Sequence, residues 1–62
     1  MLEEQQSRVE EYLQRAAMLR ALAAETRYPE VRQRLLGLAA SFERLADQVE
    51  QWGKTLLATA AD

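Results

Sequence analysis

The sequence predicts an all-α fold, an antiparallel two-helix hairpin in a single domain of residues 1–62 that dimerises into a four-helix bundle. Three observations lead to this fold class. Large apolar residues recur at helical spacing, one proline divides the chain near its middle, and 62 residues are too few for a large core. A domain of this size buries only about 60% of the surface that its unfolded chain exposes. Because the chain has no cysteine or histidine, disulfides and structural metals cannot reinforce it, and self-association is the route that remains.

The first helix is expected over about residues 3–26. Its seam, the line of residues that packs against the second helix, consists of two rows that each repeat every seven residues. One row is Leu2, Val9, Ala16 and Ala23, and the other is Gln5, Tyr12, Leu19 and Thr26. Arg20 and Arg27 are expected to supply the positive charge that a helix C-terminus favours.

A turn at residues 27–28 precedes the second helix, which is expected over about residues 29–58. Proline disfavours the helical conformation in the residue before it and suits the first helical position, so Pro29 should begin this helix. The second seam advances alternately by four and three residues through Val31, Leu35, Leu38, Phe42, Leu45, Val49, Trp52 and Leu56. Because the connection is short, the helices should be antiparallel neighbours, pairing residues whose numbers sum to about 58.

One side of the predicted hairpin, beside the seams, is apolar and mostly small. Its residues are Leu13, Ala17, Leu36, Ala39, Ala46 and Gly53. A second hairpin could cover this face and approach closely because the side chains are short, so we predict a homodimer formed through it. Two alternatives stay open. A helix of another protein could occupy the face, or alanine serves only as a good helix former and the face stays in water.

Residue types that carry chemistry are scarce in this chain. It has no histidine or cysteine and almost no loop in which to build a pocket, so we expect neither an enzyme nor a cofactor or metal site. The carboxylates fall on outer helical rows, whereas the metal sites of helix bundles draw acids into the core. The expected role is that of a structural or protein-interaction module.

The net charge of −2 gives the whole chain no long-range attraction to nucleic acid or to an anionic membrane. The first residues lack the pattern of a signal peptide, and no apolar run reaches the length of a membrane span. We therefore expect a cytoplasmic protein that makes no membrane contact.

The alternative function is that of a small dimeric nucleic-acid-binding regulator. Arg20, Arg27, Arg32 and Arg34 gather near the turn, where they could contact phosphates despite the net charge. The aromatic residues that single-strand binding favours are missing between them. The helix dipole and a pair between Arg34 and Glu30 also explain these arginines. Nucleic-acid binding therefore ranks below the structural role.

One series of residues extends over most of the chain. It comprises Tyr12, Arg15, Ala16, Leu19, Arg20 and Ala23, followed by Pro29-Glu30-Val31-Arg32, Leu35-Leu36, Leu38-Ala39 and Phe42-Glu43-Arg44-Leu45-Ala46. This series resembles that of short bacterial helical-hairpin proteins of unknown function. The resemblance implies a hairpin fold and a bacterial, cytoplasmic setting, and it supplies no activity. In that family an acidic or amide residue commonly precedes the proline, so Tyr28 departs from the pattern at the turn.

Overall fold

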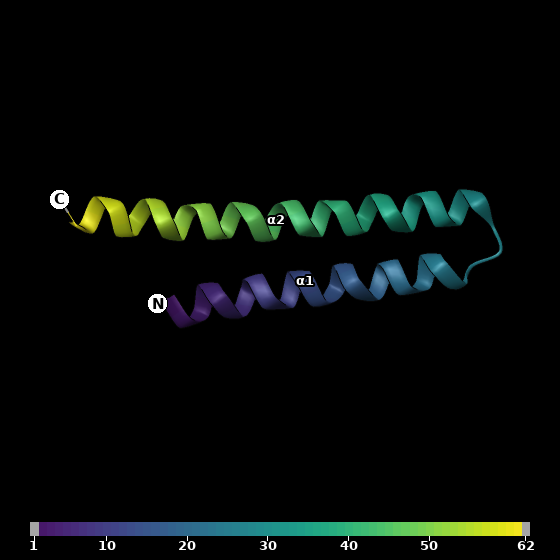
Figure 1. The fold of residues 1–62 in the computed structure, drawn as a ribbon, viewed down its shortest axis with the longest axis horizontal. Coiled ribbons are helices and arrows are strands. Elements are labelled where there is room, and N and C mark those ends of the chain that lie inside the picture. Colours follow the sequence, from purple (N-terminus) through teal and green to yellow (C-terminus); the bar gives the residue numbers. More distant parts are fainter. Residues whose placement is uncertain (1, 62) are drawn as a thin grey trace.

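The structure, a computed structural model, describes the backbone of residues 2–61 and the side chains of residues 6–55. Two helices make up this part of the chain, α1 (Leu2–Glu25) and α2 (Pro29–Ala61). They lie side by side and antiparallel, joined by residues 26–28, so both ends of the chain lie at the same end of the hairpin (Figure 1). The predicted all-α hairpin is confirmed.

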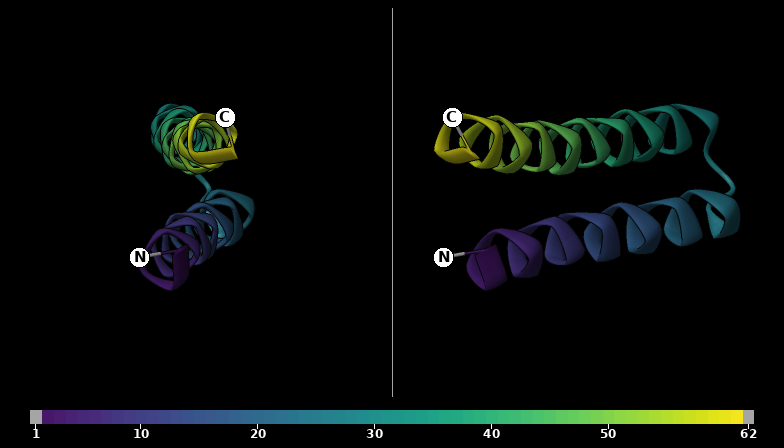
Figure 2. Two further views of the ribbon diagram at one scale, coloured as in Figure 1. Left: turned by 90° about the vertical axis from the view of Figure 1, so that its left-hand side faces the viewer. Right: turned by 60° about the vertical axis from the view of Figure 1, so that its left-hand side comes forward.

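The hairpin is long and thin. Its Cα atoms extend 52 × 16 × 10 Å with a radius of gyration of 14.9 Å, whereas a compact domain of this length has a radius of gyration of about 11 Å. The views along and across the long axis show a single layer of two helices, and α2 extends beyond α1 at the open end (Figures 1 and 2). Each helix is therefore covered on one side only, and both broad faces of the hairpin remain open.

The turn follows from the position of its proline. Pro29 is the first residue of α2, as predicted, and the carbonyl of Tyr28 accepts the first bond of that helix from the Arg32 N–H at 3.0 Å. Because proline has no N–H to leave unpaired, it suits this position. The Tyr28 N–H donates to the Thr26 hydroxyl at 3.3 Å, which closes the connection locally. Helix α1 ends at Glu25, one residue before the predicted end.

Arg32 fastens the two helices together at the turn. Its guanidinium donates from Nε to the Ala23 carbonyl at 3.2 Å and from Nη2 to the Thr26 carbonyl at 2.9 Å. The last carbonyls of a helix have no partner within the helix, and a cation there also complements the dipole. The prediction that Arg20 and Arg27 supply this charge is wrong: the last turn of α1 contains no basic residue, and α2 provides the arginine instead.

The α1 seam is the one that the sequence predicts. Val9, Ala16 and Ala23 are buried, while Tyr12 and Leu19 of the second row are half-buried. The rings of Tyr12 and Phe42 pack across the seam with their centroids 6.1 Å apart. The side chains of Leu2, Gln5 and Leu56, which belong to the predicted seams, lie outside the described residues.

The α2 seam differs from the prediction in one of its two rows. The row of Leu35, Phe42 and Val49 is half-buried, as an interfacial row should be. The companion row, however, is Ala39, Ala46 and Gly53, which are buried, with Ala39 at 0% exposure. The row predicted for this place is instead exposed; its members are Val31, Leu38, Leu45 and Trp52.

This correction amounts to a rotation of α2 about its axis. Successive residues of a helix are about 100° apart, so replacing one of two seam rows by the next residue turns the helix by about 50°. Small residues at the contact let two helix axes approach closely, and dispersion contacts strengthen as the gap closes. Ala16 and Ala23 of α1 thus pack with the small row of α2, and the leucines are left at the side.

Candidate interaction surface

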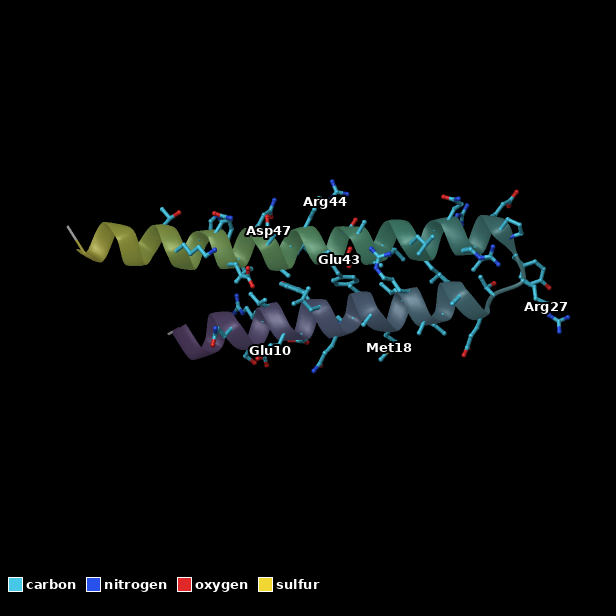
Figure 3. The ribbon with its side chains drawn as sticks, viewed as in Figure 1. Glu10, Met18, Arg27, Glu43, Arg44 and Asp47 are labelled. Carbon is cyan, nitrogen blue, oxygen red and sulfur yellow. The ribbon has the colours of Figure 1, made fainter. Side chains whose placement is uncertain are left out.

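The Arg20–Glu43 ion pair identifies one flank of the hairpin. Arg20 Nη2 lies 2.6 Å from Glu43 Oε1 and Nε lies 3.1 Å from Oε2, which is a bidentate arrangement between α1 and α2. Glu43 extends toward α1, while its neighbours Arg44 and Asp47 point away from it (Figure 3). Each member of the pair directly follows a half-buried seam residue, Leu19 or Phe42. Positions of this kind in both helices therefore share one side, which we name the ion-paired flank.

The ion pair also sets the titration of its members. The hydrogen bonds from Arg20 lower the pKa of the Glu43 carboxyl from its ordinary value, an effect that partial desolvation opposes and the guanidinium charge reinforces. The same hydrogen bonds raise the pKa of the Arg20 guanidinium. Both side chains remain nearly half exposed, so solvent screens the pair and its contribution to stability is small.

The opposite side, which we name the apolar flank, consists of Leu22, Val31, Leu38, Leu45 and Trp52. Leu22 precedes Ala23, and Leu38 precedes Ala39, so antiparallel packing places both on the side away from the Arg20–Glu43 pair. The exposed fractions are large for apolar side chains: Leu22 48%, Val31 44%, Leu38 52%, Leu45 41% and Trp52 66%. Met18, 65% exposed, borders this flank and points away from α2 (Figure 3).

Charge is unevenly distributed around the apolar flank. On α2, the next row outward is Arg34, Ser41, Gln48 and Thr55, which carries a single charge. The Ser41 hydroxyl donates to the Gly37 carbonyl of its own helix at 3.1 Å. On α1, Arg8 and Arg15 occupy the row of Leu22, and Arg15 is paired with Glu11 at 2.9 Å. The α2 side of the flank is thus apolar along its described length, whereas the α1 side becomes charged toward the open end.

The residues predicted as the dimer interface do not form one surface. Ala39, Ala46 and Gly53 are buried in the seam between the two helices, so placing them on an outward face is wrong. The other three members are accessible. Leu13 is 46% exposed, Ala17 is exposed and Leu36 is half-buried. Leu13 and Leu36 occupy the rows of the ion-paired flank. The apolar flank was not predicted, because its α2 residues, Val31, Leu38, Leu45 and Trp52, were assigned to the seam.

The four arginines proposed for nucleic-acid contact are likewise divided. Arg20 is engaged with Glu43, and Arg32 is engaged with the carbonyls at the end of α1. Arg27 projects outward from the turn (Figure 3), and Arg34 lies exposed on α2. No ion pair between Arg34 and Glu30 forms, although both side chains are described. Only two of the four arginines therefore offer unengaged guanidinium groups.

The residues that the structure describes also bear on metal binding and on membrane insertion. No group of three or more acidic, histidine or cysteine side chains is placed to hold a metal ion within that part of the chain. Over the same residues, neither helix has a stretch that is both long and apolar enough to pass through a lipid bilayer. Most of the large apolar side chains that are highly exposed in the described region gather on the apolar flank.

Comparisons with protein-family models, curated proteins and solved structures gave no match to this chain. The hairpin fold that the family resemblance implies is present in the structure. Membership of that family stays a prediction.

Proposed function

We propose that the hairpin is a self-associating structural module without enzymatic activity, in which two copies pack through their apolar flanks into a four-helix bundle. The observation that carries this proposal is that the small apolar residues are buried while large apolar residues are exposed, the reverse of an ordinary protein core. Within the described residues, the buried positions hold alanine, glycine and one valine. Four leucines and the tryptophan lie 41% to 66% exposed, and the other described leucines are half-buried. Apolar side chains contribute to stability roughly in proportion to the area removed from water. The hairpin alone leaves a large part of that contribution unused.

Surface area supports a dimer of substantial interface. The hairpin exposes 5344 Å², whereas a compact monomer of its 7.1 kDa mass exposes about 4,100 Å². A compact dimer would expose about 6,800 Å² by the same scaling. Two hairpins that reached this value would together bury about 3,900 Å², which lies within the range of obligate homodimers, about 2,000 to 5,000 Å².

The apolar flank suits this role better than the ion-paired flank. Covering the Arg20–Glu43 pair would remove two charges from water, and the desolvation penalty of a buried ion pair can exceed the attraction between its members. Leu22, Leu38 and Leu45 carry no such penalty. A second copy also fits because a two-fold axis presents the same patch on both sides of the interface, so both apolar surfaces are covered at once.

Nucleic-acid binding has less support. Arg20 and Arg32 use donors within the hairpin, and Arg27 and Arg34 alone provide few phosphate contacts at a net charge of −2. The electrostatic part of nucleic-acid affinity grows with the number of phosphates neutralised. The absence of binding to mixed RNA and DNA pools at low salt would remove this alternative.

The proposal is tested by light scattering after size exclusion, with helicity followed across a dilution series. We expect the mass of two chains, and a loss of helix that tracks dissociation because association supplies stability by mass action. A helical monomer whose ellipticity does not depend on concentration would contradict the proposal.

A further inference from the structure

We infer that the two hairpins of the dimer lie with their turns at opposite ends, so that α2 packs against the partner's α2. In this arrangement Val31 lies beside the partner's Trp52, and Leu38 lies beside the partner's Leu45. The inference rests on the proposed self-association and specifies its geometry.

The spacing of the apolar row favours this arrangement. Val31, Leu38, Leu45 and Trp52 recur every seven residues, so they form one line along α2. The line is symmetric about the point between Ser41 and Phe42. A two-fold axis at that point superimposes the line on itself in the antiparallel direction, so every exposed apolar residue of α2 meets an apolar residue of the partner.

The alternative arrangement, with both turns at the same end, would pack the apolar row of α2 against a less favourable surface. It would place α2 over the partner's α1, where the corresponding row is Arg8, Arg15 and Leu22. In the antiparallel register, the Arg15–Glu11 ion pair lies at the level of Leu45. Leu45 would therefore cover a pair whose side chains are 59% and 57% exposed. Removing those charges from water opposes the gain from burying the leucine. In the inferred arrangement the pair lies instead over the partner's α1, at the level of Leu22 and Met18, so the apolar row of α2 has no charged residue opposite it.

One exposed charge pair between the two α1 helices also favours this arrangement. The level of the two-fold axis on α1 lies between Ala16 and Ala17, because the hairpin pairs residues whose numbers sum to about 58. This axis brings Arg8 to the level of the partner's Glu25, and the symmetry repeats the pair. Both residues are exposed, and neither has an ion-pair partner among the described residues of its own hairpin. The two pairs would lie at the edges of the apolar contact, as charged residues do in the solvent-accessible rim of protein interfaces.

Spin-label distances separate the two arrangements. The chain has no cysteine, so each introduced cysteine is a unique labelling site. Arg27→Cys places a label in the turn, and Ser41→Cys places one near the proposed axis. With a rise of 1.5 Å per residue, turns at opposite ends put the two Arg27→Cys labels roughly 40 Å apart. Turns at the same end put them within about 25 Å, because neighbouring helices of a bundle lie about 10 Å apart.

The expected result is a long distance at position 27 and a short one, below about 25 Å, at position 41. A short distance at position 27 in a protein with the mass of a dimer would overturn the inferred arrangement and leave self-association standing. A monomeric mass, without dipolar coupling at either position, would overturn the proposed self-association and the arrangement together. Neither Arg27 nor the surface around Ser41 takes part in the seam, so both labelled chains are expected to fold as the parent does.

Discussion

In the seam, the fully buried row is made of small residues such as Ala16 and Ala39, and beside it runs a half-buried row of larger residues that includes Tyr12 and Phe42. On the apolar flank, the side chains are large, and each is covered only in part by its own hairpin. The seam therefore sets how closely the helices approach, while the flank holds most of the apolar area still available for burial. One surface of the chain thus allows the helices to pack closely, and another holds large apolar side chains whose burial would stabilise the fold. The apolar flank can be buried only by another molecule.

The largest effect should come from placing a charge in the seam. Ala46→Glu would bury a carboxylate at a position that is 3% exposed. Breaking the pairing of a buried charge costs about 3 to 5 kcal/mol, and an unpaired one is comparably costly. We expect this variant to lose helicity by circular dichroism. Ala17→Glu, the same change at an exposed position of α1, should retain it. Equal helicity in the two variants would contradict the observed seam.

The next effect concerns Trp52, which is the sole tryptophan of the chain and is 66% exposed in the hairpin. Association through the apolar flank should cover its indole, so emission should shift to longer wavelength and quenching by acrylamide should increase on dilution. The fluorescence transition should coincide with the change in mass. An emission maximum that stays constant while the dimer dissociates would place Trp52 outside the interface.

A smaller gain is expected at Gly37, which lies on neither flank. A Cβ added there would meet no atom within 4 Å outside the local helix, and alanine is favoured over glycine in a helix interior by about 1 kcal/mol. Gly37→Ala should raise the midpoint of thermal unfolding without changing the mass. Unchanged or lower stability would show that another group, such as a partner backbone, approaches this position.

The smallest effect is the pH dependence of the ion-paired flank. Because the pKa of Glu43 is lower in the folded chain than in the unfolded chain, the unfolded state binds protons first as the pH falls. The pair's contribution is present above the unfolded pKa and is lost as the pH falls through the folded pKa. Other carboxylates add their own acid dependence. Glu43→Gln should therefore show a slightly weaker loss of thermal stability below pH 4.5 than the parent chain. Identical acid profiles would show that the pair does not couple to folding.

The sequence was sufficient for the fold because the signals for it are local. Pro29 determines where α2 begins, and Val9, Ala16 and Ala23 recur at the period of a packed helix face. The proline restricts the backbone, and the periodic residues mark the face of one helix. Neither signal depends on which residues the other helix presents. The antiparallel direction then follows from the short connection.

The face of α2 that packs against α1 could not be predicted from the sequence in the same way. A heptad pattern ranks positions by hydrophobicity, which favours Leu38 and Leu45 for the seam, whereas close packing favours Ala39 and Ala46 one position further on. The two criteria differ by about 50° of rotation, and only the three-dimensional fit of the helices decides between them. The role of Arg32 at the turn was not predicted for a related reason, because the carbonyls that it binds belong to the end of α1 and to the connection.

The most direct test of self-association through the apolar flank compares Leu45→Glu with Leu13→Glu. The two leucines are 41% and 46% exposed and lie on opposite flanks, so the same change probes each flank at similar exposure. We predict that Leu45→Glu has the mass of a monomer, whereas Leu13→Glu retains that of a dimer. Leu38→Glu, at 52% exposure, repeats the test if Leu45→Glu loses its helices. Dimers of Leu38→Glu and Leu45→Glu, or monomers of Leu13→Glu alone, would contradict the assignment of the interface to the apolar flank.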